Sequence, residues 1–131
     1  MSTTKNGAKP PKTEIEKWME GLGIKKTDLD TMKKEHRGLK IVTIYPYDEP
    51  DETDNPDTVR FIIRPMTRKE TEMVATKAGK DTNVALLNKQ ILKYCLVDGD
   101  RDRLEEGPVY TGLLKEIAEV NEAKSTSRKN F

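Results

Sequence analysis

The side chains suited to catalysis or metal binding are few and scattered in this sequence. His36 is the only histidine, Cys95 is the only cysteine, and no serine lies in a Gly-x-Ser-x-Gly motif. Because active sites depend on paired groups, we expect His36 to lie near the carbonyls of a helix end and Cys95 to be a small apolar core residue. A single cysteine also excludes an intrachain disulfide. The sequence therefore predicts a protein that is not an enzyme and has no cofactor.

Two acidic segments resemble metal-binding loops in composition only. An EF-hand that began at Asp98 would need glycine at its sixth position and glutamate at its twelfth, where this sequence has Arg103 and Val109. Residues 48–57 hold six acidic residues and two prolines, so the segment repels itself and cannot continue a strand. We favour a solvated loop there over the alternative, a weakly bound divalent ion.

One basic cluster stands out in the middle of the chain. It consists of Arg60, Arg64, Arg68 and Lys69, with Phe61 and Ile62 among them. A nucleic-acid site is one interpretation, but the aromatic residues and glycines typical of an RNA-binding sheet are missing. Arginine beside apolar residues is common at protein interfaces. We therefore predict that these six residues bind a protein partner.

The pattern of residues around the cluster predicts the elements that position it. Alternation and β-branched content predict strands over residues 39–47 and 59–63, joined across the acidic loop as an antiparallel pair. Arg64-Pro65 ends the second strand, and Thr67 with Glu70 forms a capping box that begins a helix reaching Gly79. An exposed edge of this strand pair would accept a strand or an apolar helix of a partner.

Helical patterns flank the strands on both sides. One helix is predicted from the N-cap Thr13, and a second from about residue 27 to residues 36–38. A later helix, capped by Asp81, is predicted through Val97; ten of the fourteen residues from 84 to 97 are apolar, which favours a central position. A final helix begins at Gly107-Pro108. The predicted core residues lie on these last two helices: Leu87, Ile91, Leu113 and Ile117.

These elements predict an α+β fold. We expect a mainly helical single domain over residues 13–123, with a two-stranded antiparallel hairpin packed on helices. Residues 1–12 and 124–131 each carry three basic residues and no acid, which predicts flexible basic tails. The middle then holds 18 basic and 23 acidic residues and is a poor polyanion binder. No apolar run reaches the length of about 18 residues that spans a bilayer, so we expect a cytoplasmic protein without a membrane partner.

The central segments resemble the small tail assembly chaperones of long-tailed bacteriophages. The resemblance runs from "MKKEHRGLKIVTIYPY" through "VRFIIRPMTRKE" to "NKQILKYCLVDGD" and the closing helix, about 90 of 131 residues. In that family a charged helix ends at a glycine before a strand, and a second strand ends in an Arg-Pro-Thr-Arg-like corner. A later helix carries Asn and Cys before a Gly-Asp turn. Gly38, residues 64–69 and residues 87–100 are the counterparts here, with Met66 in place of the expected threonine.

This resemblance implies a non-enzymatic protein of the host cell cytoplasm that binds the tape measure protein. It would keep that protein soluble while tail tube subunits polymerise, and the tail tube protein is a second candidate partner. The resemblance also implies self-association in multiple copies. Two alternatives stay open: a small phage structural or cargo protein retained in the virion, and a nucleic-acid-binding regulatory protein.

Overall fold

The computed structural model describes residues 13–49, 56–80 and 83–123. Contacts divide the chain into two compact units, Met1–Glu35 and His36–Phe131, and each unit is described by itself. The predicted tails lie outside the described residues, as does most of the acidic loop. Within the described ranges, no helix has both the length and the apolar character that crossing a membrane requires.

The first unit contains a pair of short helices, α1 (Glu14–Gly21) and α2 (Lys26–Glu35). α1 begins where the sequence predicted, because Thr13 Oγ1 accepts a hydrogen bond of 3.1 Å from the backbone N–H of Glu16. Among the described residues of this unit, the buried apolar ones are Met19, Ile24 and Leu29. The helix predicted from about residue 27 is also present: it is α2, which begins at Lys26.

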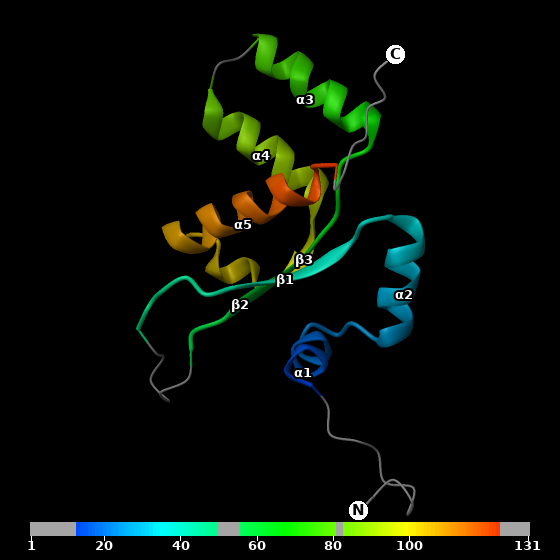
Figure 1. The fold of residues 1–131 in the computed structure, drawn as a ribbon, viewed down its shortest axis with the longest axis vertical. Coiled ribbons are helices and arrows are strands. Elements are labelled where there is room, and N and C mark those ends of the chain that lie inside the picture. The colour runs from blue at the N-terminus through cyan, green and yellow to red at the C-terminus, as the bar shows by residue number, and fades with distance from the viewer. Residues whose placement is uncertain (1–12, 50–55, 81–82, 124–131) are drawn as a thin grey trace, which may run out of the picture. The chain divides into compact units, whose positions relative to one another are not determined.

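The second unit contains an antiparallel sheet of three strands, β1 (Lys40–Ile44), β2 (Val59–Ile63) and β3 (Leu96–Gly99) (Figure 1). The strand order is β1-β2-β3, so β2 is the central strand. The α+β class is confirmed. The prediction of a two-stranded hairpin was wrong. β3 pairs with the edge of β2 opposite β1, for which the sequence predicted no partner strand.

β3 follows α4 (Val84–Cys95) without an intervening loop. The sequence predicted that this helix would continue to Val97, but Leu96 already has extended backbone angles, with φ −84° and ψ 111°. Gly99 has φ 146°, and a Cβ atom there would lie 2.7 Å from Phe61 Cα. Only glycine therefore allows β3 to lie this close to β2.

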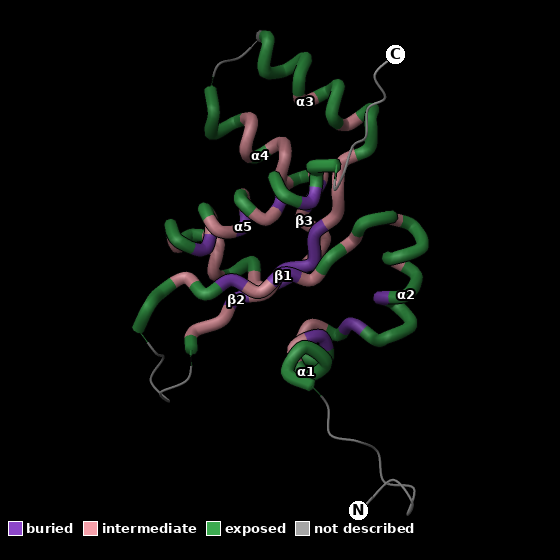
Figure 2. Tube along the Cα trace, in the orientation of Figure 1, coloured by how far each residue is buried: buried purple, intermediate pink, exposed green. Residues whose placement is uncertain are grey.

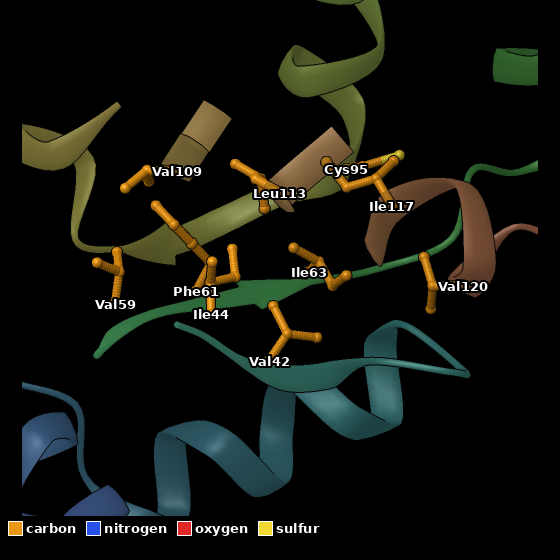
Figure 3. Close-up of a cluster of buried hydrophobic side chains, with 10 residues drawn as sticks. All are labelled: Val42, Ile44, Val59, Phe61, Ile63, Cys95, Val109, Leu113, Ile117 and Val120. Atoms are coloured by element: carbon orange, nitrogen blue, oxygen red, sulfur yellow. The ribbon is translucent and has the colours of Figure 1, made fainter. Parts of the chain in front are cut away.

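α5 (Gly107–Val120) packs on one face of the sheet and buries the main core (Figure 3). Its approach is close, since a Cβ atom at Gly112 would lie 2.9 Å from Ile44 Cγ2. The helix begins at the predicted Gly107-Pro108. The core cluster consists of Val42, Ile44, Val59, Phe61, Ile63, Cys95, Val109, Leu113, Ile117 and Val120.

The predicted core is confirmed on α5 and was largely wrong on α4. Leu113 and Ile117 are buried, whereas Ile91 is partly buried against the cluster and Leu87 is half-buried outside it. Cys95, at the C-terminal end, is the only buried residue of α4. Apolar content alone therefore did not place this helix in the centre of the fold.

α3 (Arg68–Lys80) and α4 pack on each other, and much of their surface is exposed (Figure 2). None of the described side chains of α3 is buried. Asn83 caps α4 by accepting a hydrogen bond of 3.0 Å from the N–H of Ala85. Asp81, the predicted cap, lies outside the described residues. α3 and α4 thus form a helical arm that projects beyond the core.

Candidate partner-binding site

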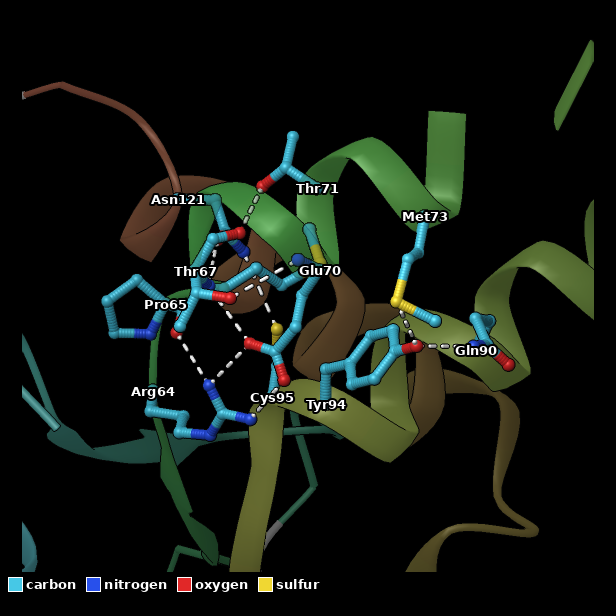
Figure 4. Close-up of polar contacts among 11 residues, drawn as sticks. Arg64, Pro65, Thr67, Glu70, Thr71, Met73, Gln90, Tyr94, Cys95 and Asn121 are labelled. Atoms are coloured by element: carbon cyan, nitrogen blue, oxygen red, sulfur yellow. Dashed lines mark hydrogen bonds and ion pairs between the residues drawn. The ribbon is translucent and has the colours of Figure 1, made fainter. Parts of the chain in front are cut away.

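The predicted cluster is centred on a corner, residues 64–70, where β2 ends and α3 begins (Figure 4). The guanidinium of Arg64 donates two hydrogen bonds to Glu70, from Nη1 to Oε1 at 2.9 Å and from Nη2 to Oε2 at 2.8 Å. The Arg64 and Glu70 side chains are only 13% and 18% exposed. These hydrogen bonds, and then the one from the Thr67 backbone, lower the pKa of Glu70 to about 2. Arg64 therefore stabilises the corner, and both terminal nitrogens of its guanidinium are bonded to Glu70.

Further hydrogen bonds connect the corner to α4 and α5. Asn121 Oδ1 accepts from the N–H of Met66 at 2.7 Å, while Asn121 Nδ2 donates to the carbonyl of Ile117 at 2.9 Å. The backbone N–H of Arg64 donates to the carbonyl of Cys95 at 2.9 Å. Burial raises the pKa of the Cys95 thiol, which favours the neutral form. The corner is therefore a structural junction of three elements.

The remaining predicted residues divide into buried and exposed ones. Phe61 and Ile62 are fully buried on the central strand, so β2 offers neither an open edge nor these side chains to a partner. Arg60 Nε donates to Thr43 Oγ1 on β1 at 3.2 Å. Arg68 and Lys69 are exposed at the start of α3, and Arg68 pairs with Glu72 at 3.0 Å. The structure thus brings the six residues near one junction but leaves only Arg68 and Lys69 clearly at the surface.

The surface of the second unit is more apolar on the helical arm than at the corner. Met73 on α3 is 47% exposed, and Val84 and Leu86 on α4 are 66% and 44% exposed. The two helices are joined by a hydrogen bond of 3.7 Å from the Tyr94 hydroxyl to Met73 Sδ. Large apolar side chains that stay in water are a common mark of an interaction site when they gather on one face.

A groove of about 590 Å³ lies beside Leu86, between α4 and the segment that leads into α5. Its walls are mainly apolar, with Lys89, Asn83 and Glu105 as the polar side chains. We name it the α4 groove. The α4 groove is lined by Asn83, Ala85, Leu86, Lys89, Leu92, Leu104, Glu105, Gly107 and Tyr110.

A polar cluster fixes the segment that forms the second wall of the α4 groove. Arg103 donates to both oxygens of Asp57, with Nη2 at 2.8 Å from Oδ2, and also contacts both oxygens of Glu106. The Tyr47 hydroxyl donates to Glu106 Oε1 at 2.8 Å. Hydrogen bonds from Arg103 first, and then from Tyr47, lower the pKa of Glu106 to about 2. These contacts tie the start of the groove wall, residues 103–106, to Asp57 and Tyr47.

Sequence reasoning missed the α4 groove and the Arg103 cluster. Both join residues that are far apart in the sequence, and the local pattern around Arg103 indicates only a mismatch to a calcium loop. One signal was present: the run of apolar residues from 84 to 87 is too continuous for a single buried face of a helix.

Neither the metal chemistry of the described residues nor similarity to known proteins assigns a function. Within residues 13–49, 56–80 and 83–123, no three or more His, Cys, Asp or Glu side chains are grouped so that they could hold a metal ion. What the site offers is an apolar groove with one lysine and one glutamate at its margin. No protein-family model, curated protein or solved structure matches this chain.

Proposed function

We propose that this protein is a non-enzymatic tail assembly chaperone of a long-tailed phage. It binds apolar helical segments of the tape measure protein in the host cytoplasm and keeps them soluble while the tail tube forms. The α4 groove, with the exposed Leu86 on its wall, is the observation that carries this proposal.

The shape and chemistry of the α4 groove favour a helix as its occupant. Ala85, Leu86 and Leu92 present apolar side chains from α4, and Leu104 and Tyr110 present them from the opposite wall. An amphipathic helix binds such a groove by inserting residues spaced three or four apart, while its polar face stays in water. Tyrosine is enriched in such sites because it offers both an apolar ring and a hydroxyl.

Polar residues at the margin favour a defined orientation of the bound helix. Lys89 on α4 and Glu105 on the opposite wall are both exposed and differ in charge. A helix with an acidic residue on one flank and a basic residue on the other would pair with both in one orientation only. Rim charges of this kind affect specificity and association rate more than affinity.

The identity of the partner comes from the resemblance of residues 32–47, 59–70 and 88–100 to tail assembly chaperones. A tape measure protein is expected to be long, helical and apolar, so it needs cover before the tube surrounds it. A small protein with an open apolar groove is suited to that task when many copies bind along the chain.

Co-expression with a candidate tape measure protein, encoded next to this gene, tests the proposal. We expect the wild-type chain to raise the soluble fraction of the tape measure protein and to co-purify with it. Leu86→Glu should reduce co-purification by about tenfold or more, because it places a charge in the apolar groove. Val84→Glu is the matched control, since Val84 is an exposed apolar residue of the same helix that does not line the groove.

The outcomes separate this proposal from its alternatives. A Leu86→Glu variant that folds, as judged by circular dichroism, and still co-purifies fully would exclude the α4 groove. Mass spectrometry of purified virions should not detect the protein; stoichiometric amounts would instead identify a structural or cargo protein. Binding to nucleic acid that falls steeply with salt would favour the regulatory alternative.

A further inference from the structure

The two outer edges of the sheet differ in how well they are protected. On β3, the pairing with β2 contains a register shift at Ile62/Ile63. The carbonyl of Val97 already accepts a hydrogen bond of 2.8 Å from Arg101 Nη2. Bulges and charged residues are the devices by which proteins keep an edge from pairing with another chain. β3 is therefore a poor site for strand addition.

β1 has fewer of these devices than β3. Its five residues pair with β2 in an unbroken register, from Lys40 opposite Ile63 to Ile44 opposite Val59. It contains no proline, and its single charged residue is the exposed Lys40 at one end. Among the described residues, no strand pairs with the other side of β1.

The hydrogen bonds of β2 show which groups of β1 point outward. Arg60 directs its backbone groups toward β3, because its N–H donates to Asp100 Oδ2 and its carbonyl accepts from the Asp100 N–H. Neighbouring residues of a strand point their backbone groups in opposite directions, so Phe61 directs its groups toward β1. Phe61 lies opposite Val42, which therefore bonds inward. It follows that the N–H and C=O groups of Ile41 and Thr43 point away from the sheet.

We propose that β1 pairs with β1 of a second copy of this chain, antiparallel and about a two-fold axis at Val42. In this register Ile41 of each copy lies opposite Thr43 of the other copy, which gives two such pairs. The outward N–H and C=O groups of both residues then form four hydrogen bonds between the copies. The pairing would extend the sheet to six strands, and it does not rest on the proposed function.

Charge favours a second copy in this orientation. Exposed Arg37 precedes β1, and exposed Asp48 and Glu49 follow it. The sequence stays acidic after Glu49, with Asp51, Glu52 and Asp54. Antiparallel pairing places the basic end of one copy beside the acidic end of the other, whereas parallel pairing would place like charges together. The β1 edges of two copies in this orientation are therefore complementary in charge.

The size of the contact indicates a weak dimer. A five-residue strand pair, with exposed Tyr45 and Tyr47 next to it, is smaller than the interfaces of stable dimers. We expect dissociation in the micromolar range, so that the dimer forms where copies are concentrated, as on a shared long partner.

Analytical ultracentrifugation of the full chain over a range of concentrations tests this inference. We expect the wild type to dimerise, and Thr43→Pro to weaken the dimer by about tenfold or more, because each copy loses an outward N–H. Proline is tolerated on an edge strand where the N–H faces solvent. Thr43→Ala is the matched control: it removes the same hydroxyl but keeps the N–H, and its dimer should stay within about twofold of wild type.

A second variant covers the case in which Thr43→Pro does not fold, as judged by circular dichroism. Asp48→Lys with Glu49→Lys changes only exposed residues and should weaken the dimer several-fold at low salt, with a smaller effect at high salt. A wild type that stays monomeric up to about 300 μM would overturn the inference. A folded Thr43→Pro variant that dimerises as well as Thr43→Ala would also overturn it, and so would a charge-reversed variant with unchanged dimerisation.

Discussion

α4 and α5 are both rich in apolar residues, but α5 buries four of them and α4 buries only Cys95. The buried residues of α5 are Val109, Leu113, Ile117 and Val120, spaced four, four and three apart. This spacing keeps them on one side of the helix. In α4 the apolar residues from Val84 to Leu87 follow one another directly, so they surround the helix and cannot all face the sheet. The comparison shows that the spacing of apolar residues, rather than their number, decides which helix lies in the core.

The apolar residues that α4 does not bury form a surface. Val84 and Leu86 remain 66% and 44% exposed, and Leu86 lines the α4 groove. The exposure of Leu86 adds nothing to the stability of the free protein and becomes favourable only when a partner fills the α4 groove. α5 therefore contributes mainly to the core, and we propose α4 as the helix that binds the partner.

The largest expected effect comes from shortening the same side chain on the two helices. Leu113→Ala should lower the free energy of unfolding by about 2–5 kcal/mol, because Leu113 is fully buried under the sheet. Leu86→Ala should change it by less than about 1 kcal/mol, since the side chain is already half in water. Urea unfolding of both variants measures the difference. Equal losses for the two would show that α4 belongs to the core.

Glu70 and Glu72 on α3 extend the comparison to charged residues. Glu70→Gln should cost about 1.5–3 kcal/mol at neutral pH, because it removes the negative charge and replaces one of the two oxygens that accept from Arg64 with a donor NH2 group. Glu72→Gln should cost less than about 0.5 kcal/mol, since the pair with Arg68 is exposed.

The Glu70 contribution should also depend on pH. Arg64 and the Thr67 backbone hold the pKa of Glu70 at about 2 in the folded protein, below its ordinary value of 4.5. A lowered folded pKa gives stability that is present above the ordinary pKa and is lost as pH falls toward the folded one. The difference between wild type and Glu70→Gln should therefore be constant above about pH 5 and shrink between 4.5 and about 2. A difference that does not change with pH would contradict the role given to this pair.

Two glycines should differ in the sign of the effect when each is replaced by alanine. Gly112→Ala should destabilise by about 1–2 kcal/mol, because the new methyl group would lie 2.9 Å from Ile44 Cγ2 on β1. Gly79→Ala should stabilise by about 0.5–1 kcal/mol, since it lies in α3 with no atom within 4 Å of the new group. The melting temperatures of the two variants should shift in opposite directions, and a Gly112→Ala variant that is as stable as wild type or more stable would mean that α5 does not pack closely on β1.

Local signals predicted much of the fold. Thr13 caps α1, the strand over residues 59–63 has the predicted bounds, and the N–H of Glu70 donates to Thr67 Oγ1 at 3.2 Å at the start of α3. Each of these features depends on residues within one turn or on simple alternation. Such signals are readable because the interacting groups are neighbours in the sequence.

Features that join distant segments were not predictable in this way. β3 follows α4 directly, and its pairing is set by Phe61 and Ile62, more than thirty residues earlier. The same pairing changed β2 from an edge strand to the central one. The α4 groove likewise needs α4 to lie beside residues 104–110, which no local pattern indicates. The burial of Phe61 and Ile62, two of the six predicted partner-binding residues, was not predictable for the same reason, because it depends on tertiary packing.

Protection of a thiol in the α4 groove is the most direct test of the claim that α4 binds the partner. The native Cys95 is buried and its pKa is raised by burial, so it should react slowly in the folded protein. Leu86→Cys places a reactive thiol in the groove, and Val84→Cys places one on the same helix outside it. Mass spectrometry measures how fast each introduced thiol is alkylated. The rate is measured for the protein alone and again in the presence of its proposed partner, the tape measure protein. We expect saturating partner to slow alkylation of Leu86→Cys by about tenfold or more and to leave Val84→Cys nearly unchanged. Equal rates for Leu86→Cys with and without the bound partner would contradict the account.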